Sequence, residues 1–351
     1  MRKYLFAVAD YPPRVGGAAR YHAAVARALG ADGATHLVRP DRHWMRLLWE
    51  IPIALRRHRA GALLVGEVLP IGTVAWLLRC IGGPPYAVIC HGLDLRNAQR
   101  VPRKRWIARR ILAHACSVIV NSAFTGRLAE ASGARPAHTH IVPPPLGITP
   151  DLTRSASVAD VRVRERLERA RIVLSVGRLV ARKGFDTLIR AVALLRREFP
   201  RAVLALAGDG PERPRLEALA RAERLAVRFL PGLTDAELAA WYRACDVFAL
   251  LPDERADGDV EGFGIVYLEA GAFGKPVVGT RSGGVPEAVL DGETGILVPP
   301  QDPAAACAAI ARLFRDPHAA QRLGANGARR VAQTHGSERF AAAIRSALLD
   351  A

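Results

Sequence analysis

Hydrophobic positions along this chain gather in short runs that mostly end in glycine or polar residues, and each run precedes a stretch with helical periodicity. Short apolar runs that alternate with amphipathic helices are typical of a parallel sheet covered by helices. The predicted strands are 4–9, 62–65, 86–90, 117–120 and 140–142 in the first half, and 172–176, 203–207, 227–230, 247–250, 277–279 and 296–298 in the second. Helices are predicted over the final stretch, 304–349. The whole chain is therefore expected to be α/β.

Two domains are expected, because 351 residues are enough for two separate cores. Residues 143–160 are dense in Pro, Ser and Thr and cannot hold a regular element for long. This stretch divides the chain into domains 1–150 and 151–351, with the last helix a candidate to pack back onto the first domain. Doubly wound sheets bind ligands at the carboxyl ends of their strands, so two facing sheets would form one deep cleft.

The composition favours a protein that does not cross a membrane, because no apolar tract is long enough to span a bilayer. The basic start, 1–17, is interrupted by Asp10 and two prolines, which indicates a strand and its loop rather than a signal peptide. The five cysteines lie far apart without a C-x-x-C pair, so neither a zinc site nor a disulfide framework is expected, and a reducing cytoplasm fits.

The formal net charge of +17 favours anionic partners such as phosphates, nucleic acid or acidic lipid. Charge alone does not choose among them, and an Ala- and Arg-rich composition explains part of the excess equally well.

Two basic residues follow the strand 172–176: Arg178 and Lys183, just before a helix predicted over 185–199. The planar guanidinium and the mobile ammonium suit the neutralisation of a diphosphate at the start of a helix. A basic turn between strand and helix is also common without any function.

The segment 261–269 carries two glutamates, Glu261 and Glu269, on either side of a Gly-rich turn and the helix that it opens. The free N–H groups of Phe263, Gly264 and Ile265 would point at an anion, aided by the helix dipole. Glu269 would reach ribose hydroxyls and Glu261 would lie beside a sugar. Taken alone, Glu269 is more simply a surface carboxylate of the helix.

Further glycine loops follow other strands, at 208–211 and 280–287, and ordinary tight turns explain both equally well. In the first half, Gly16 and Gly17 precede a helix that runs to Gly30, and His91 follows the strand 86–90. An imidazole at the end of a strand can hydrogen-bond a sugar or carry a proton near neutral pH, although a lone histidine is more often structural.

Taken together and in this order, these residues resemble the retaining glycosyltransferases of family 4, which have the GT-B architecture of two facing Rossmann-like domains. The resemblance covers nearly the whole chain. It rests on the early Gly16-Gly17 loop, His91-Gly92, NSAFT at 121–125, GRLVARKG at 177–184, AGDGP at 207–211, the Glu-x7-Glu segment 261–269, and SGGVPE at 282–287 followed by DGETGILVPP at 291–300.

The resemblance implies that Arg178 and Lys183 bind the donor diphosphate and that Glu269 binds the donor ribose. It also implies that Glu261, with the backbone amides that follow it, contacts the transferred sugar, which His91 hydrogen-bonds near the reacting carbon. Family members retain the anomeric configuration by a front-face attack in which the leaving phosphate helps to deprotonate the acceptor. Positive charge on the diphosphate would then be the main catalytic factor.

Within the family, YPPRVGGAARYH and DVEGFGIVYLEAGAFGKPVV most resemble the phosphatidylinositol-mannoside mannosyltransferases, which use GDP-mannose; related stretches also occur in enzymes with other donors. The implied partners are a nucleotide-diphosphate sugar and a lipid-linked or glycan hydroxyl acceptor. Neither a metal nor another cofactor is expected, so the Asp257-Gly-Asp259 spacing is interpreted as a loop and not as a metal site.

Two stretches of the first half join basic and aromatic residues, at 41–59 and 96–110. Helices of this kind can lie on an anionic membrane and bring a lipid-linked acceptor to the cleft, so the inner face of the plasma membrane is a candidate location. A solvated basic face explains the same pattern.

The sequence can also be compared with the features that three other functions require. A nucleic-acid-binding protein would need aromatic residues interleaved with the basic ones, but only 6% of the residues are aromatic and no binding module is recognised. A nicotinamide-dependent enzyme would need G-x-G-x-x-G after the first strand, which the chain lacks. A non-catalytic sensor of sugar nucleotides stays an alternative, because a protein can keep its binding residues after it has lost catalysis.

Overall fold

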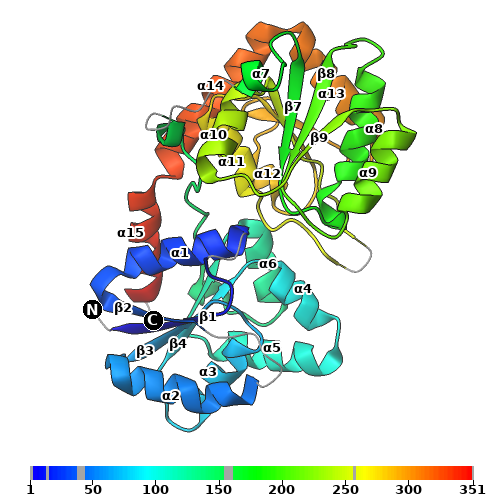
Figure 1. Ribbon diagram of the computed structural model, residues 1–351. Coiled ribbons are helices and arrows are strands. Elements are labelled where there is room, and N and C mark those ends of the chain that lie inside the picture. The colour runs from blue at the N-terminus through cyan, green and yellow to red at the C-terminus, as the bar shows by residue number, and fades with distance from the viewer. Residues whose placement is uncertain (1–2, 13–15, 38–43, 154–160, 256–257, 350–351) are drawn as a thin grey trace. The chain divides into compact units, whose positions relative to one another are not determined.

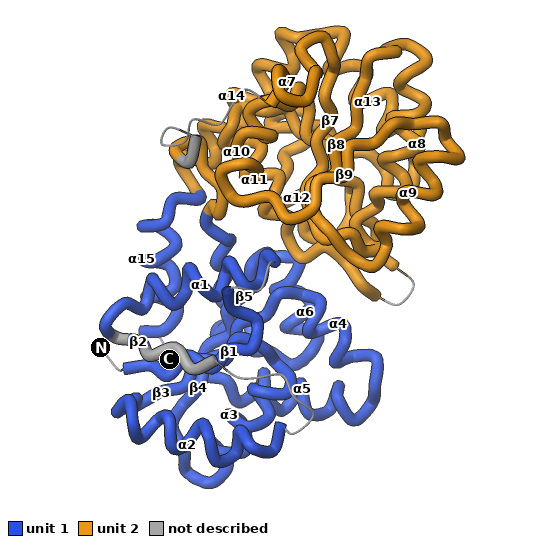
Figure 2. Tube along the Cα trace, viewed as in Figure 1, with its two compact units in different colours: residues 1–145, 335–351 blue, residues 146–334 orange. Residues whose placement is uncertain are grey.

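The computed structural model describes residues 3–12, 16–37, 44–153, 161–255 and 258–349. The chain forms two compact units (Figure 2): unit 1 comprises Met1–Pro145 and His335–Ala351, and unit 2 comprises Leu146–Thr334. The first division falls close to the expected boundary at residue 150, and residues 335–351 belong to unit 1. Each unit contains one six-stranded parallel sheet with helices packed on it (Figure 1), so the expected α/β class is confirmed.

The sheet of unit 1 has the strand order β2-β1-β3-β4-β5-β6. Its strands are β1 (Tyr4–Val8), β2 (Gly33–Leu37), β3 (Ala62–Val65), β4 (Tyr86–Cys90), β5 (Ser117–Val120) and β6 (Thr139–Ile141). The strand β2 was not predicted, because its sequence GATHL contains no apolar run. Among the described strands it lies at the edge of the sheet and pairs only with β1, so it does not need the continuous hydrophobic run of a central strand.

Alternation along β1 sends its side chains into two cores on opposite faces of the unit 1 sheet. Leu5 and Ala7 pack with residues of α2 (Leu47–His58), α3 (Ile71–Cys80) and α5 (Pro102–His114). Tyr4, Phe6 and Val8 pack instead with residues of α1 (Gly17–Leu29) and α15 (Ser337–Leu349). Two further helices, α4 (Leu93–Gln99) and α6 (Ala123–Ala131), follow strands of the same sheet. Unit 1 is therefore a layer of strands between two layers of helices.

The last helix of the chain, α15, completes the core of unit 1. The ring of Phe340 lies edge-on to that of Tyr21 with 5.2 Å between their centroids, and the Tyr4 hydroxyl donates a hydrogen bond to the Leu348 carbonyl at 2.7 Å. Residues more than 300 positions apart in the chain thus share one core.

The sheet of unit 2 has the strand order β12-β11-β10-β7-β8-β9. All six of its strands were predicted: β7 (Arg171–Val176), β8 (Ala202–Ala207), β9 (Val227–Leu230), β10 (Val247–Ala249), β11 (Val277–Thr280) and β12 (Gly295–Val298). They are fully parallel, and their apolar runs are long enough to be recognised because most of them are covered on both faces.

The helices of unit 2 are α7 (Val161–Arg164), α8 (Phe185–Leu195), α9 (Arg213–Ala222), α10 (Asp235–Ala244), α11 (Ile265–Ala272), α12 (Val285–Ala288), α13 (Pro303–Arg315) and α14 (Pro317–Thr334). Helix α8 packs against α9 and α13, and α11 packs against α14. The helix expected over 185–199 ends earlier, at Leu195, and the helices expected over 304–349 are confirmed as α13, α14 and α15.

Each sheet reverses its strand order at one point, and this point is where doubly wound folds bind ligands. In unit 1 the reversal falls between β1 and β3, and in unit 2 it falls between β7 and β10. The loops that leave the carboxyl ends of these strands contain most of the residues singled out from the sequence. The fold therefore locates a candidate site at one edge of each sheet.

Candidate active site

The turn after β7 presents Arg178 at the switch point of unit 2, and a second turn fixes it there. A Cβ atom at Gly208 would lie 2.1 Å from the Gly177 carbonyl oxygen, and one at Gly210 would lie 2.4 Å from that of Leu179. The Leu179 N–H donates to the Asp209 carbonyl at 2.9 Å. Glycine is required here because two backbones touch, which the sequence alone did not distinguish from an ordinary tight turn.

On its other side, the same turn packs tightly against the loop that follows β10. Gly184 has φ +63°, and a Cβ atom on it would lie 1.8 Å from the Leu251 carbonyl oxygen. The Asp253 N–H donates to the Arg182 carbonyl at 3.0 Å. The loops that follow β7, β8 and β10 thus form one rigid edge.

Lys183 and Glu261, which sequence analysis placed in separate motifs, form an ion pair. The side chain of Lys183 also lies against Gly177, beside the turn that carries Arg178. Next to this pair, Arg182 contacts Asp259 at 3.2 Å. Burial opposes the ionisation of Glu261, but the charges of Lys183 and Arg182 outweigh it and hold the pKa of Glu261 below its usual range. Glu261 is therefore a carboxylate at neutral pH.

Arg178 differs from its basic neighbours. Its side chain is exposed, and within the described ranges it makes no hydrogen bond or ion pair. A guanidinium with unused donors at the switch point can form bidentate hydrogen bonds to an anion without first breaking another contact.

The loop from Glu261 to Gly264 is held by contacts between backbones. Cβ atoms at Gly283 and Gly284 would lie 2.3 Å and 2.0 Å from the carbonyl oxygens of Glu261 and Gly262. Gly264 has φ +89° and lies on the ring of Tyr267. The loop at 280–287 therefore supports the loop that opens α11.

Helix α11 begins at Ile265, and Gly264 is its N-cap residue. Within the described residues, the N–H groups of Gly264 and Ile265 donate no hydrogen bond. These two N–H groups lie at the positive end of the helix dipole, as the sequence predicted. A role for the Phe263 amide remains a prediction; its side chain is buried.

Glu269 is buried, not a surface carboxylate of its helix, with 1% of its surface exposed. Its Oε2 accepts a hydrogen bond from the Tyr242 hydroxyl at 2.9 Å. A carboxylate kept in the interior of a helical layer needs such partners, so its orientation is fixed. Its proposed contact with a ribose remains a prediction.

In unit 1, Gly16 and Gly17 lie at the start of α1 and, unlike the glycines of the unit 2 loops, do not pack against another described backbone segment. Gly17 is the first residue of α1 and Gly16 is its N-cap. Among the described residues, apart from chain neighbours and the helix itself, no atom lies within 4 Å of a Cβ built on either glycine. Open space beside the start of a helix leaves room for a ligand to approach the backbone.

His91 follows β4 and contacts a second histidine that sequence analysis did not identify, His22 on α1. Their Nε2 atoms are 2.9 Å apart, and Nδ1 of His22 is 2.7 Å from the Asp10 carbonyl oxygen. Burial lowers the pKa of both imidazoles, that of His91 well below its usual range. The position of His22, in the second turn of the helix that follows the Gly16-Gly17 loop, was the available sequence signal.

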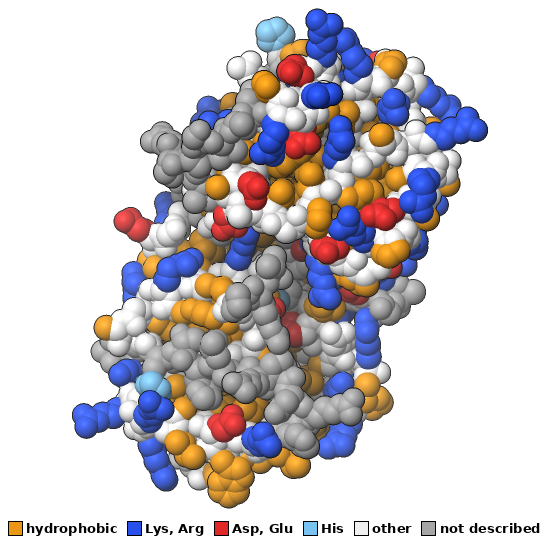
Figure 3. Space-filling view, viewed as in Figure 1, with side chains coloured by type: hydrophobic (Ala, Val, Ile, Leu, Met, Phe, Trp, Pro, Cys, Tyr) orange, Lys and Arg blue, Asp and Glu red, His pale blue; other side chains and the backbone are white. Residues whose placement is uncertain are grey.

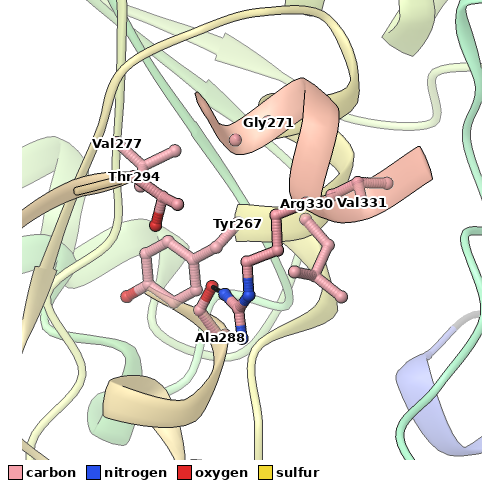
Figure 4. Close-up of a pocket in the computed structure, with 9 residues that line it drawn as sticks. Tyr267, Gly271, Val277, Ala288, Thr294, Arg330 and Val331 are labelled. Carbon is pink, nitrogen blue, oxygen red and sulfur yellow. Dashed lines mark hydrogen bonds between the residues drawn. The ribbon is translucent and has the colours of Figure 1, made fainter. Parts of the chain in front are cut away.

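A small pocket of unit 2 lies between α11 and α14 (Figure 4). Tyr267, Gly271, Val277, Ala288, Thr294, Arg330 and Val331 line it together with Leu268 and Gly327. Arg330 donates to the carbonyls of Glu287 and Ala288 at 2.6 Å and 2.8 Å. The lining includes none of the residues predicted to bind a donor, and its arginine is engaged with the backbone.

A metal site is a separate question. Among the described residues, no group of three or more His, Cys, Asp or Glu is arranged to hold a metal ion. Asp257 of the Asp257-Gly-Asp259 match lies outside the described residues, and Asp259 is paired with Arg182. Metal independence therefore stays a prediction.

Comparison with known families assigns both units. The profile described as "Glycosyl transferase 4-like domain" matches residues 5–145, and that described as "Glycosyl transferases group 1" matches residues 159–330. The folds agree: the Anabaena protein HepE, solved in complex with UDP-glucose, matches with a TM-score of 0.84 at 20% identity, covering 100% of both chains. The chain belongs to the family 4 glycosyltransferases, which have the GT-B fold.

Two proteins of known activity are similar to the chain over nearly its full length. The chain is 35% identical to the GDP-mannose-dependent alpha-(1-6)-phosphatidylinositol monomannoside mannosyltransferase of Mycolicibacterium smegmatis, over 91% of each chain. It is 33% identical to the Mycobacterium tuberculosis H37Rv protein of the same name, over 93% of each chain.

Proposed function

We propose that this glycosyltransferase moves mannose from GDP-mannose to a lipid-linked or glycan hydroxyl, with retention of the anomeric configuration. The names of the mycobacterial relatives support this donor and this class of acceptor, because those proteins resemble the chain over nearly its full length. The observation that carries the proposal is the basic edge of unit 2, where Arg178 is exposed next to the Lys183–Glu261 pair.

Each charged group at this edge has a separate task in the proposed reaction. Arg178 and Lys183 neutralise the charge that develops on the leaving diphosphate, which lowers the barrier because the cations are already in place. Glu261, held as a carboxylate, accepts hydrogen bonds from hydroxyls of the transferred sugar. The leaving phosphate helps to deprotonate the acceptor hydroxyl.

The remaining residues bind the donor. Glu269 accepts hydrogen bonds from the ribose, and the N–H groups at the start of α11 contact the sugar or phosphate. His91 of unit 1 hydrogen-bonds the sugar, and the open backbone at Gly16 and Gly17 approaches a phosphate.

No metal takes part in the proposed reaction, because the two cationic side chains supply the positive charge that a metal would bring. Turnover is expected to be unchanged by excess EDTA. A loss of activity with EDTA that Mg²⁺ or Mn²⁺ restores would contradict this part of the proposal.

The acceptor side involves α2 and the turn before it. Met45, in the turn before α2, and Trp49 and Ile53, on α2, are 61%, 76% and 64% exposed. The spacing of Trp49 and Ile53 places these two side chains on one face of the helix. Arg56 and Arg57 lie exposed in its last turn. An apolar stripe beside cations matches a surface that inserts among anionic lipids. None of the described helices is long and apolar enough to cross a bilayer.

The second basic stretch, 96–110, is divided by a break between α4 and α5, so it is not one continuous surface helix. Trp106 is exposed on α5, with the guanidinium of Arg110 5.3 Å from its ring centroid. On the visible face of the molecule, Lys and Arg side chains are spread over both units among acidic ones (Figure 3). The exposed tryptophans are therefore a more specific signal for lipid than the net charge.

Vesicle sedimentation tests the lipid surface. Wild-type protein is expected to bind vesicles that contain acidic lipid at low salt, and Trp49→Ser is expected to bind more weakly. Glu50→Gln, an exposed neighbour that adds no apolar surface, is the control. Absence of binding by the wild type at low salt would contradict a membrane-bound acceptor.

The donor is tested by thermal shift with GDP-mannose, UDP-glucose and ADP-glucose. A ligand present at 100 times its dissociation constant stabilises the folded state by about 2.7 kcal/mol. GDP-mannose alone is expected to raise the melting temperature, and GDP release with an acceptor is expected to follow. Stabilisation without release with any acceptor offered would favour a sugar-nucleotide sensor, and no stabilisation by any donor would contradict the proposal.

A further inference from the structure

The contact between His22 and His91 is unusual because two imidazoles share one hydrogen bond. Their Nε2 atoms are 2.9 Å apart, so one must donate a proton and the other must accept it. His22 is fully buried and His91 is half-buried. With both rings neutral, their mutual contact and the Asp10 carbonyl together define one arrangement of protons.

The proton positions follow from the partner at the far end. Nδ1 of His22 is 2.7 Å from the Asp10 carbonyl oxygen, which can only accept, so Nδ1 carries the proton. Since burial keeps His22 neutral, its Nε2 has a lone pair. His91 must then donate from Nε2, and its Nδ1, as part of a neutral ring, is left as an acceptor.

The ring of His22 is closely packed, and its contacts with the Asp10 carbonyl and with His91 distinguish it from the flipped ring. A Cβ atom on Gly66 would lie 3.1 Å from both Cε1 and Nε2 of His22, so the ring fills the space that a side chain would need. Phe6 lies edge-on to the ring at 5.7 Å between centroids. Tyr21 packs edge-on against the ring of His91 at 5.2 Å.

His91 is also held by its backbone. Its N–H donates to Oδ1 of Asp94 at 3.0 Å, at the start of α4. Within the described residues, no hydrogen bond reaches Nδ1 of His91. The acceptor atom is therefore the one polar atom of the ring that other described residues leave available.

We infer that His22 is a positioning residue, which fixes His91 as the Nε2–H tautomer and so aims the lone pair of Nδ1 at a hydroxyl of the substrate. The role of the hydroxyl rests on the proposed function, whereas the tautomer does not. The carbonyl of Asp10 sets the direction of the whole chain of hydrogen bonds.

The tautomer is measured directly by long-range ¹H–¹⁵N correlation spectra of the full chain with ¹⁵N-labelled histidine at pH 7.5. His91 is expected to show a protonated Nε2 and an unprotonated Nδ1, and His22 the reverse pattern. Spectra of His91→Gln and His22→Gln identify the two spin systems among the ten histidines. A protonated Nδ1 on His91 would overturn the inference, whatever the reaction is.

Substitution of His22 tests the consequence for catalysis. His22→Leu removes the acceptor for Nε2–H, so kcat is expected to fall about tenfold with KM for the donor changed by no more than about twofold, the effect of losing one hydrogen bond. In His22→Gln the amide oxygen is expected to replace the lone pair, to keep the His91 tautomer and to restore most of kcat.

His138→Leu is the matched control, because Nδ1 of His138 also contacts a carbonyl of unit 1, that of Cys116 at 2.8 Å. Equal effects of His22→Leu and His138→Leu on kcat would overturn the positioning role. Wild-type protein that shows the expected tautomer but no transfer would contradict the proposed function and leave the tautomer assignment intact.

Discussion

The two sheets end in edges of opposite character, although their topology is similar. At the switch point of unit 2, charged residues surround glycine loops whose backbones touch. At that of unit 1, two histidines that burial keeps neutral share a hydrogen bond, and one of them lies on α1. One edge offers fixed positive charge, which suits a diphosphate, and the other offers a neutral acceptor, which suits a hydroxyl.

The difference lies in the loops and not in the fold. Glycines at 177, 184, 208 and 210 allow the loops of unit 2 to stack on one another, so the cations have a rigid base. Such preorganisation matters most where charge develops during a reaction, because fixed groups need no rearrangement. The comparison can be tested by changes that affect one edge and spare the other.

The largest effect is expected from Gly184→Ala. A Cβ atom would lie 1.8 Å from the Leu251 carbonyl at φ +63°, so the β7 and β10 loops must separate. Chemical denaturation is expected to show a loss of about 4 kcal/mol or failure to fold. Gly274→Ala is the control, since Gly274 has φ +68° with nothing within 4 Å. It should cost about 1 kcal/mol. An equal loss of unfolding free energy in both variants would show that the β7 and β10 loops are not held in close contact at Gly184.

Next in size is Arg178→Ala, which removes a cation from the leaving group. Initial-rate kinetics are expected to show kcat/KM lower by about 10²–10³, or about 3–4 kcal/mol of transition-state stabilisation. Arg201→Ala, an exposed arginine just before β8 and so at the other end of the sheet, is the control. If both variants keep full activity, Arg178 does not contact the diphosphate.

Asp94→Asn addresses the neutral edge through pH. Burial raises the pKa of Asp94 to about 6, against 3.8 for an ordinary Asp. The favourable contribution of its protonated form is complete below pH 3.8 and is lost as the pH rises through about 6. An amide in place of this carboxyl does not ionise and avoids the loss, so the variant should be more stable than wild type at pH 8 by up to about 3 kcal/mol.

Denaturation at pH 8 and pH 4 checks the sign of this effect. The difference between Asp94→Asn and wild type is expected to shrink toward pH 4, where the wild-type carboxyl is protonated. A variant that is less stable than wild type at pH 8 would mean that Asp94 is a stabilising carboxylate and that burial does not raise its pKa.

A smaller effect is expected from Tyr242→Phe, which removes the hydroxyl that donates to Glu269. The free energy of unfolding should fall by about 1–2 kcal/mol, and GDP should bind more weakly because Glu269 loses a fixed orientation. Tyr86→Phe loses a buried hydrogen bond to the Ile111 carbonyl in unit 1. It should show a similar loss of stability without a change in GDP affinity; equal weakening of GDP binding by both would exclude a ribose contact by Glu269.

Sequence patterns predicted all the central strands of both sheets, and the edge strands β6, β9 and β12 as well. The strands of unit 2 appear as apolar runs, whereas β2, an edge strand with the sequence GATHL, gave no such signal. The order of motifs located Arg178, Lys183, Glu261 and His91 after their strands.

Contacts between distant segments could not be predicted from these patterns. Nothing in the spacing shows that Lys183 pairs with Glu261, that Glu269 is buried against Tyr242, or that His22 meets His91, because each pair joins different elements of the fold. The glycines at 208 and 210 were also ambiguous, since a tight turn and a close approach of two backbones need the same residue.

The most direct test of the central claim is the affinity for GDP of Arg178→Ala and His91→Ala, measured by isothermal titration calorimetry. If unit 2 holds the diphosphate by charge, Arg178→Ala should weaken binding by about 10–100-fold, the loss of one or two charge-assisted hydrogen bonds. His91→Ala should bind GDP as the wild type does while losing transfer. Unchanged affinity in Arg178→Ala, or weakened affinity in His91→Ala alone, would contradict the account.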